Sequence, residues 1–99
     1  TPPPQLPAEP VGRQLAVRQD LAARLGIPVA EVSVASYRRV TWPDGCLGVY
    51  DPGSVCSQAL VEGWLAKVVA GGREYRYHGS SGERFLAADF RPGAEVREP

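Results

Sequence analysis

Two cysteines, Cys46 and Cys56, carry the most distinctive chemistry of this chain, and they have a C-x9-C spacing. A zinc site needs four clustered nitrogen or sulfur ligands, whereas the sequence offers these two cysteines and a single histidine. A redox-active dithiol favours a shorter spacing and an electropositive helix end, and the sequence shows neither. We therefore predict a structural disulfide, which implies an oxidising compartment and removes roughly 3 kcal/mol of unfolded-state freedom.

His78 is the only imidazole, and Ser80 and Ser81 follow it closely enough to suggest a small hydrolase. Such an enzyme also needs a carboxylate to orient the histidine and an oxyanion hole, and His-Gly-Ser-Ser-Gly lacks the nucleophile-elbow pattern. A histidine at the end of a strand is more often a partly exposed packing residue. We predict no catalytic residue and no enzymatic activity. A hydrogen bond between His78 and a serine inside a cleft would favour the hydrolase alternative.

Asp44 and Asp51 lie on either side of Cys46 and could supply oxygen ligands to calcium. Two carboxylates without a third at ligand spacing are weak evidence for such a site. Aspartates in turns more commonly accept hydrogen bonds from nearby backbone N–H groups. We therefore predict turn capping for both residues, with no metal and no cofactor.

Leu47, Val49 and Tyr50 lie between the two cysteines. An apolar tip held rigid by a disulfide resembles the exposed loops with which small inhibitors enter protease clefts, because pre-organisation lowers the entropy cost of binding. On this interpretation the three residues form a binding loop, with Leu47 or Tyr50 as the inserted side chain. The alternative is that they fold inward and close the end of a sheet, since large exposed apolar clusters are uncommon in monomers.

The composition excludes some classes of function. Lys+Arg and Asp+Glu both number 11, so the formal net charge of zero disfavours nucleic acid and anionic membranes as partners. No apolar run approaches the roughly 18 residues that span a bilayer, and no signal segment is present. The chain lacks methionine, so Thr1 is not a translation start, and we expect a mature or truncated product whose targeting segment has been removed. A hydrophobic content of 43% suffices for one modest core.

The cysteine-containing loop must be positioned by the elements on either side of it. Residues 1–10 are proline-rich and predict an extended tether. A helical period then begins and stops before Gly26 and Pro28, which predicts a helix over residues 11–25. Its apolar stripe consists of Val11, Leu15, Ala22 and Leu25, with Leu21 at the edge.

Alternating residues predict a strand over residues 32–42 and a later hairpin around Gly71-Gly72. In the first strand Val32, Val34, Val40 and Trp42 share one parity, and the interrupted pattern between them indicates a bulge or bend. The two-residue turn sets the hairpin register, which puts Trp64, Ala66, Val68, Tyr75 and Tyr77 on one apolar face. On the other face Lys67 lies opposite Arg76, so we expect that face to be exposed to solvent or to meet a partner.

Residues 57–62 fit either a half-turn or a strand, and residues 84–89 predict a final strand. The order predicts an α+β domain over residues 11–90, in which one N-terminal helix packs on a small antiparallel sheet of about four strands with one disulfide-closed loop. An all-β barrel is the alternative. We expect residues 91–99 to be a loosely held tail.

The chain also carries a signature of short motifs. In chain order they are W-P-D-G-C-L-G at 42–48, P-G-x-x-C at 52–56, Gln58, Gly63-Trp64 and Tyr75-x-Tyr77-His78. These motifs resemble a group of small exported bacterial domains over roughly residues 11–78, and the resemblance implies export and a disulfide but no chemistry. The helix-then-meander order is also similar to PepSY and cystatin-like modules, several of which restrain peptidases, although fold does not carry function.

These observations lead to one functional hypothesis and one alternative. We expect a non-enzymatic domain, exported to the periplasm, cell envelope or extracellular space, that binds a partner through the cysteine loop and the exposed hairpin face. Protease inhibition is the sharpest version of this hypothesis, so the expected partner is a protease or an envelope protein. The alternative is a structural or accessory module of the cell envelope.

Overall fold

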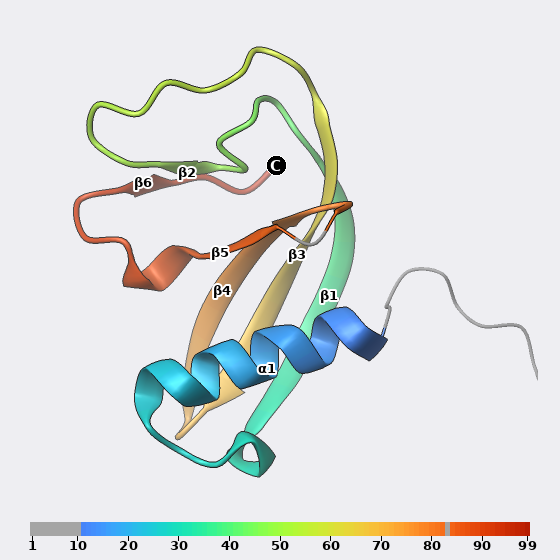
Figure 1. Cartoon of the computed structure of the whole chain (residues 1–99), viewed down its shortest axis with the longest axis vertical. Helices are drawn as coiled ribbons and strands as arrows, with labels where there is room; N and C mark the ends of the chain where they lie inside the picture. The colour runs from blue at the N-terminus through green and yellow to red at the C-terminus, as the bar shows by residue number, and fades with distance from the viewer. Residues whose placement is uncertain (1–10, 83) are drawn as a thin grey trace, which may run out of the picture.

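The computed structural model describes residues 11–82 and 84–99, so the predicted tether over residues 1–10 lies outside the described part of the chain. A helix lies across one face of an antiparallel sheet (Figure 1), which confirms the predicted α+β class. The main sheet has the order β1-β3-β4-β5, and β2 pairs with β6 in a second, two-stranded sheet. The bounds are α1 Val11–Leu25, β1 Val32–Trp42, β2 Val49–Tyr50, β3 Val61–Ala70, β4 Arg73–Ser80, β5 Phe85–Ala87 and β6 Glu95–Val96, with short 3-10 helices at Val29–Glu31 and Ala88–Phe90.

α1 has the predicted bounds, but its buried stripe is centred differently. Val17 and Leu21 are 1% and 0% exposed, whereas Leu15 is 42% exposed. Leu15 lies roughly 120° around the helix axis from Leu21, so only one of them can point straight into the sheet. The placement of Leu15 in the buried stripe was therefore wrong.

β1 contains the predicted irregularity, and the irregularity changes which face each residue occupies. The pairing with β3 shifts register between Val34 and Ser36. One inserted residue moves every later side chain to the other face. Val32 therefore packs in the core beneath α1, whereas Val40 and Trp42 pack in a second core on the opposite face. The prediction that these residues share one face was wrong.

The β3–β4 hairpin has the predicted register. Val68 lies opposite Tyr75, and Ala66 lies opposite Tyr77. This apolar row packs against α1 and forms the main core. On the other face Lys67 lies opposite Arg76, as predicted. The sequence left residues 57–62 open between a half-turn and a strand. They run as a loop to Leu60 and enter β3 at Val61.

Two tryptophans on opposite sheet faces explain two glycines of the sequence. The Trp42 indole donates a hydrogen bond to the Gly79 carbonyl at 2.9 Å, and its ring lies where a Cβ at Gly63 would stand. The Trp64 indole occupies the space that a Cβ at Gly79 would need. A Cβ at Gly63 would also meet the Gly79 carbonyl oxygen. Glycine is therefore required at position 63 by the close approach of backbone and ring, and at position 79 by the close approach of a ring.

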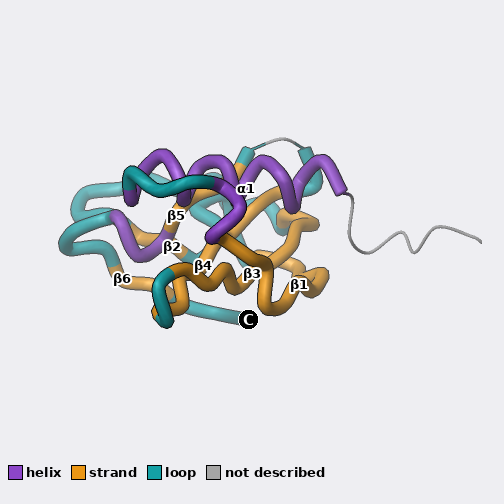
Figure 2. The backbone as a smooth tube through the Cα atoms, turned by 90° about the horizontal axis from the view of Figure 1, so that it is seen from below, coloured by secondary structure: helices purple, strands orange, loops and turns teal. Residues whose placement is uncertain are grey.

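The hairpin face that was expected to be exposed is half covered. Leu65 and His78 lie on it and are 2% and 0% exposed, because the cysteine loop and the C-terminal residues form a layer over that end of the sheet. Figure 2 shows α1 on one side of the sheet and the C-terminal end on the other. Residues 91–99, expected to be a loosely held tail, supply β6, which pairs with β2, and the Arg97 N–H donates to the Gly48 carbonyl at 2.7 Å.

Candidate functional site

The cysteine loop is closed by the predicted disulfide. Cys46 and Cys56 are bonded, with their Cα atoms 5.3 Å apart. The Asp44 carboxylate lies with both sulfur atoms inside 4.8 Å. Because the sulfurs are bonded to each other, they are not thiolates and cannot serve as a pair of metal ligands. The geometry therefore favours a structural role for this cluster.

The two loop aspartates have different roles. The Asp44 carboxylate accepts hydrogen bonds from the Cys46 N–H and the Tyr50 hydroxyl, both at 3.0 Å, so its predicted role in turn capping is confirmed. Partial burial, together with the Asp44 hydrogen bond, raises the pKa of Tyr50. Asp51 instead forms an ion pair with Arg91 at 3.4 Å. These contacts fasten the first half of the loop to the fold.

Of the three predicted binding residues, two are buried and one is half-buried. Leu47 and Val49 are 0% and 2% exposed, and Tyr50 is half-buried. Leu47 has a positive φ of 57°, which is unusual for a residue with a side chain. β2 pairs with β6, and this pairing closes the layer over Leu47 and Val49. The placement of these two side chains in an exposed binding loop was wrong, because folding inward buries their apolar area.

His78 is fully buried, although we expected it to be partly exposed. Its ring stacks on Trp42 with centroids 4.7 Å apart, and its Nδ1 is 2.7 Å from the Leu47 carbonyl oxygen. The Nε2 atom is buried and has no hydrogen-bond partner among the described residues. Burial lowers the pKa of His78 below its ordinary value of 6.5.

The serines near His78 do not form the arrangement that a hydrolase needs. The Ser80 hydroxyl lies 3.4 Å from the Arg84 carbonyl, to which it donates. Neither ring nitrogen of His78 is hydrogen-bonded to a serine in the described part of the chain. The hydrogen bond between His78 and a serine that would have favoured the hydrolase alternative is therefore absent from the described residues.

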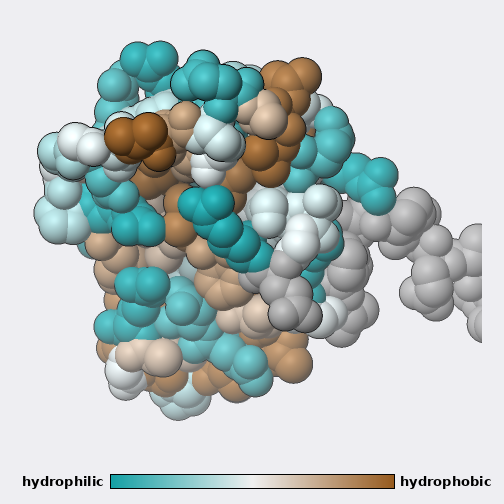
Figure 3. All heavy atoms as spheres, turned by 45° about the horizontal axis from the view of Figure 1, so that its top comes forward, coloured by the Kyte–Doolittle hydropathy of each residue, from teal (hydrophilic) through white to brown (hydrophobic). Residues whose placement is uncertain are grey.

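Large exposed apolar residues lie in the second half of the loop and just after it. Val55 is 96% exposed and Leu60 is 73% exposed. Figure 3, in which the loop end of the molecule comes forward, shows hydrophobic atoms at the surface between polar ones. We call residues 51–60 the display segment. Because single exposed residues are common, the informative feature of this segment is how firmly its backbone is held.

Three contacts hold the display segment. Cys56 is bonded to Cys46, the Gly45 N–H donates to the Ser57 carbonyl at 3.0 Å, and the Ser54 N–H donates to the Asp51 carbonyl at 3.0 Å. These contacts lie on both sides of Val55. The residues after Val55 are therefore fixed to Gly45 and Cys46, and the residue before it is held in a turn within the segment.

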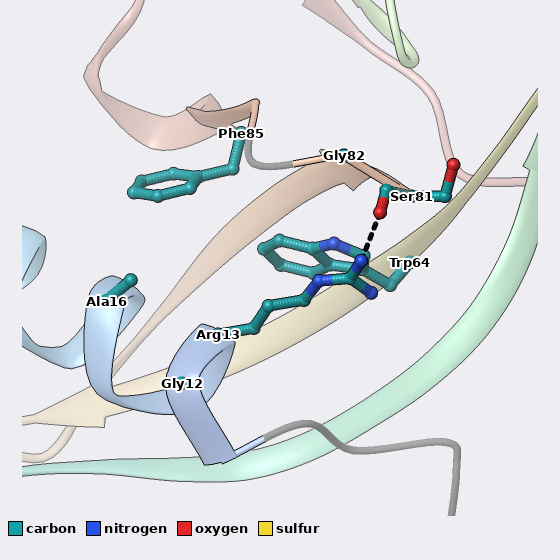
Figure 4. Close-up of a pocket in the computed structure, with 7 residues that line it drawn as sticks. All are labelled: Gly12, Arg13, Ala16, Trp64, Ser81, Gly82 and Phe85. Atoms are coloured by element: carbon teal, nitrogen blue, oxygen red, sulfur yellow. Dashed lines mark hydrogen bonds between the residues drawn. The ribbon is translucent and has the colours of Figure 1, made fainter.

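A second feature is a cleft between α1 and the turn that joins β4 to β5, with a volume of about 630 Å³. We call it the α1–β5 cleft (Figure 4). Trp64 forms its floor, and the Arg13 side chain extends from α1 across it to the Ser81 carbonyl. The residues that line it are Gly12, Arg13, Ala16, Trp64, Ser81, Gly82 and Phe85.

Sequence reasoning missed this cleft for a clear reason. Gly12 and Ala16 are small residues one helical turn apart, which hints at a shallow groove beside Arg13. The opposite wall, with Phe85, comes from the other end of the chain. Only the sheet order, which brings β5 next to β4, places the two walls together.

Comparison with known proteins gives one match. The model of a family described as a domain of unknown function, DUF8738, matches residues 14–88, which include α1, the cysteine loop and the main sheet. No curated protein and no solved structure matches the chain. Within residues 11–82 and 84–99, no helix has the length and apolar character that crossing a membrane requires.

Proposed function

The chain belongs to the DUF8738 family of domains of unknown function, and we propose that it is a non-enzymatic, exported module that binds a partner protein through the display segment. The disulfide supports export, because such bonds persist in oxidising compartments. The description of the family names no activity that could be tested in this chain. The proposal therefore depends on the geometry of the loop.

One observation carries the proposal: Val55 is 96% exposed and directly precedes a disulfide-bonded cysteine. Exposing a valine leaves apolar area in water that burial would stabilise by about 1.5–3 kcal/mol. Ordering a mobile loop on binding would offset much of that gain. Because the backbone on both sides of Val55 is already held, more of the gain is available to an interface.

A serine protease is the partner that this geometry suits best. Proteases bind extended segments and accept one side chain of the bound segment in a specificity pocket. Residues 54–57 form neither helix nor strand, and Val55 projects from them. A valine fits a small aliphatic pocket better than a deep aromatic or acidic one. The sharper proposal is therefore inhibition of an elastase-like protease, with Val55 in place of the buried Leu47 as the inserted side chain.

The test is inhibition of elastase-like, chymotrypsin-like and subtilisin-like serine proteases by the oxidised protein, measured with small chromogenic substrates. We expect the strongest inhibition of the elastase-like class. Val55→Phe should move the preference toward the chymotrypsin-like class, and Val55→Asp should abolish inhibition. The same substitution at another exposed valine, Val29→Asp, is the matched control and should leave inhibition unchanged.

Two results would overturn the protease proposal. One is that the folded, oxidised protein inhibits none of the three classes. The other is rapid cleavage after Val55 without accumulation of a complex, which would make the segment a substrate. Either result would favour the alternative of a structural or accessory module of the cell envelope.

A further inference from the structure

We propose that the α1–β5 cleft binds a small amphipathic carboxylic acid, with its apolar body on Trp64 and Phe85 and its carboxylate on Arg13. The cleft volume of about 630 Å³ lies within the range of roughly 300–1,000 Å³ that small-molecule sites occupy. The cleft and the display segment lie on different elements. This inference therefore stands independently of the proposed function.

The floor of the cleft is apolar and rigid. The Trp64 ring stacks on Tyr37 with centroids 5.5 Å apart and meets Phe85 with centroids 6.2 Å apart. The Trp64 indole N–H already donates to the Ser80 carbonyl at 2.9 Å. Trp64 is only 2% exposed, so the indole contributes a small area of ring surface at the bottom of the cleft and no free polar donor, whereas the half-buried Phe85 supplies the more accessible ring. This apolar lining suits an alkyl or aryl body.

The walls of the cleft leave room for that body. Figure 4 shows Gly12 and Ala16 on the helix side and Gly82 on the opposite side, with Phe85 projecting from β5 above Trp64. Apart from its chain neighbours and the backbone of α1 itself, no atom of the described residues lies within 4 Å of where a Cβ at Gly12 would stand. The small residues therefore keep open a space that ordinary side chains would fill.

Arg13 supplies the polar end of the cleft. Its guanidinium donates to the Tyr37 hydroxyl at 3.4 Å and to the Ser81 carbonyl. Both of these acceptors are neutral oxygens, so these two contacts orient the guanidinium without neutralising it. A guanidinium carries five N–H donors and pairs with a carboxylate through two parallel hydrogen bonds. A cation beside an apolar floor is complementary to an acid with an apolar tail.

The experiment compares acids with their neutral amides. The probes are 4-phenylbutyrate and decanoate, each paired with the corresponding amide, and binding to the full chain is measured by calorimetry and by the fluorescence of the tryptophans. We expect each acid to bind at least about tenfold more tightly than its amide, because hydrogen bonds between a guanidinium and a carboxylate are stronger than those to a neutral amide. A peptide that ends in phenylalanine tests whether the carboxylate of a protein chain is preferred.

Two variants separate the head of the site from its body. Arg13→Gln should reduce the affinity for the acid about tenfold or more, to the level of the amide, and leave amide binding unchanged. Ala16→Leu should abolish binding of both probes by filling the cleft, and both residues are good helix formers, so the fold should be retained. Arg38→Gln is a matched control. Arg38 lies directly opposite Leu65 across the β1–β3 pair, and Leu65 belongs to the second core, so Arg38 is on the sheet face that does not carry the cleft. Ala23→Leu is the control for added volume at an exposed helix position.

The proposal is overturned if neither acid binds, if acid and amide bind equally, or if Ala16→Leu binds both probes as the original chain does. Tighter binding of the peptide than of either free acid would overturn the assignment to a small molecule. Circular dichroism of each variant establishes that a loss of binding is not a loss of fold.

Discussion

The buried imidazole of His78 makes acid pH a specific perturbation of this fold. Its Nδ1 lies 2.7 Å from the Leu47 carbonyl oxygen, so in the neutral ring the proton is on Nδ1 and Nε2 carries a lone pair. Protonation would add an N–H at Nε2, which has no acceptor among the described residues. We predict that protonation of His78 loosens the layer formed by the cysteine loop and β6.

The size and sign of the effect follow from linkage. Burial lowers the pKa of His78 below 6.5 in the folded chain. The stabilising contribution is therefore present above pH 6.5 and is lost as the pH falls from 6.5 through the folded pKa, by at most about 1.4 kcal/mol per pH unit. A buried donor left without an acceptor costs about 1–3 kcal/mol, and more when it is charged. Only about 1.5 pH units lie between 6.5 and 5, so we expect the free energy of unfolding to fall by up to about 2 kcal/mol between roughly pH 7.5 and 5.

Denaturant unfolding at a series of pH values measures this loss, and the imidazole resonances of the chain's single histidine report its pKa directly. His78→Gln keeps a donor for the Leu47 carbonyl but does not titrate, so its stability should be flat over the same interval. The titration of Asp89 does not contribute to the change in stability over this pH interval. Burial alone would raise its pKa, but hydrogen bonds from Arg76 lower it below 3.8, so its contribution is lost only at lower pH. A measured His78 pKa at or above 6.5, or equal slopes for the two proteins, would refute the reasoning.

Three further variants test the packing. Replacing Cys46 and Cys56 together by serine should lower the free energy of unfolding by about 3 kcal/mol, measured by denaturant, and a loss below about 1 kcal/mol would show that the ring restrains the unfolded chain little. Leu47→Ala should cost about 2–5 kcal/mol if its side chain closes the second core, against almost nothing if it were exposed. Gly79→Ala would drive a methyl group into the Trp64 ring, and we expect a loss of about 1–3 kcal/mol with a changed near-ultraviolet tryptophan signal; an unchanged signal would contradict the close approach.

The hairpin could be predicted from the sequence because its information is local. Two adjacent glycines at positions 71 and 72 set a two-residue turn, and that turn fixes every later pair, including Val68 with Tyr75. The information that predicted the helix over residues 11–25 was equally local, because a stop signal directly follows the helical pattern. The predicted disulfide needed only the number and spacing of the cysteines.

The faces of β1 could not be predicted to the same extent. The interrupted pattern indicated a bulge, but not that the residues beyond it would change sides. Val40 and Trp42 therefore seemed to continue the row of Val32, and they instead build the second core. The alternation of residues along a strand predicts which sheet face each one occupies only up to the first inserted residue.

The location of the candidate site depended on a contact between distant segments. Nothing in the residues around Val49 shows that β6, almost fifty positions later, pairs with them. That pairing decides that Leu47 and Val49 are buried, and it moves the exposed part of the loop to Val55. The α1–β5 cleft is non-local in the same way.

The disulfide ring thus divides into two parts with different physical roles. From Cys46 to Tyr50 the chain is fastened to the body by β6 and by the buried Leu47 side chain. Beyond Asp51 no strand pairs with the loop until β3 begins at Val61, so those residues stay at the surface. A disulfide between the two parts transmits the rigidity of the packed part to the exposed part without burying it. This arrangement suits the binding role that we propose, because the side chains remain accessible while the contacts of Ser54, Cys56 and Ser57 already restrain the backbone.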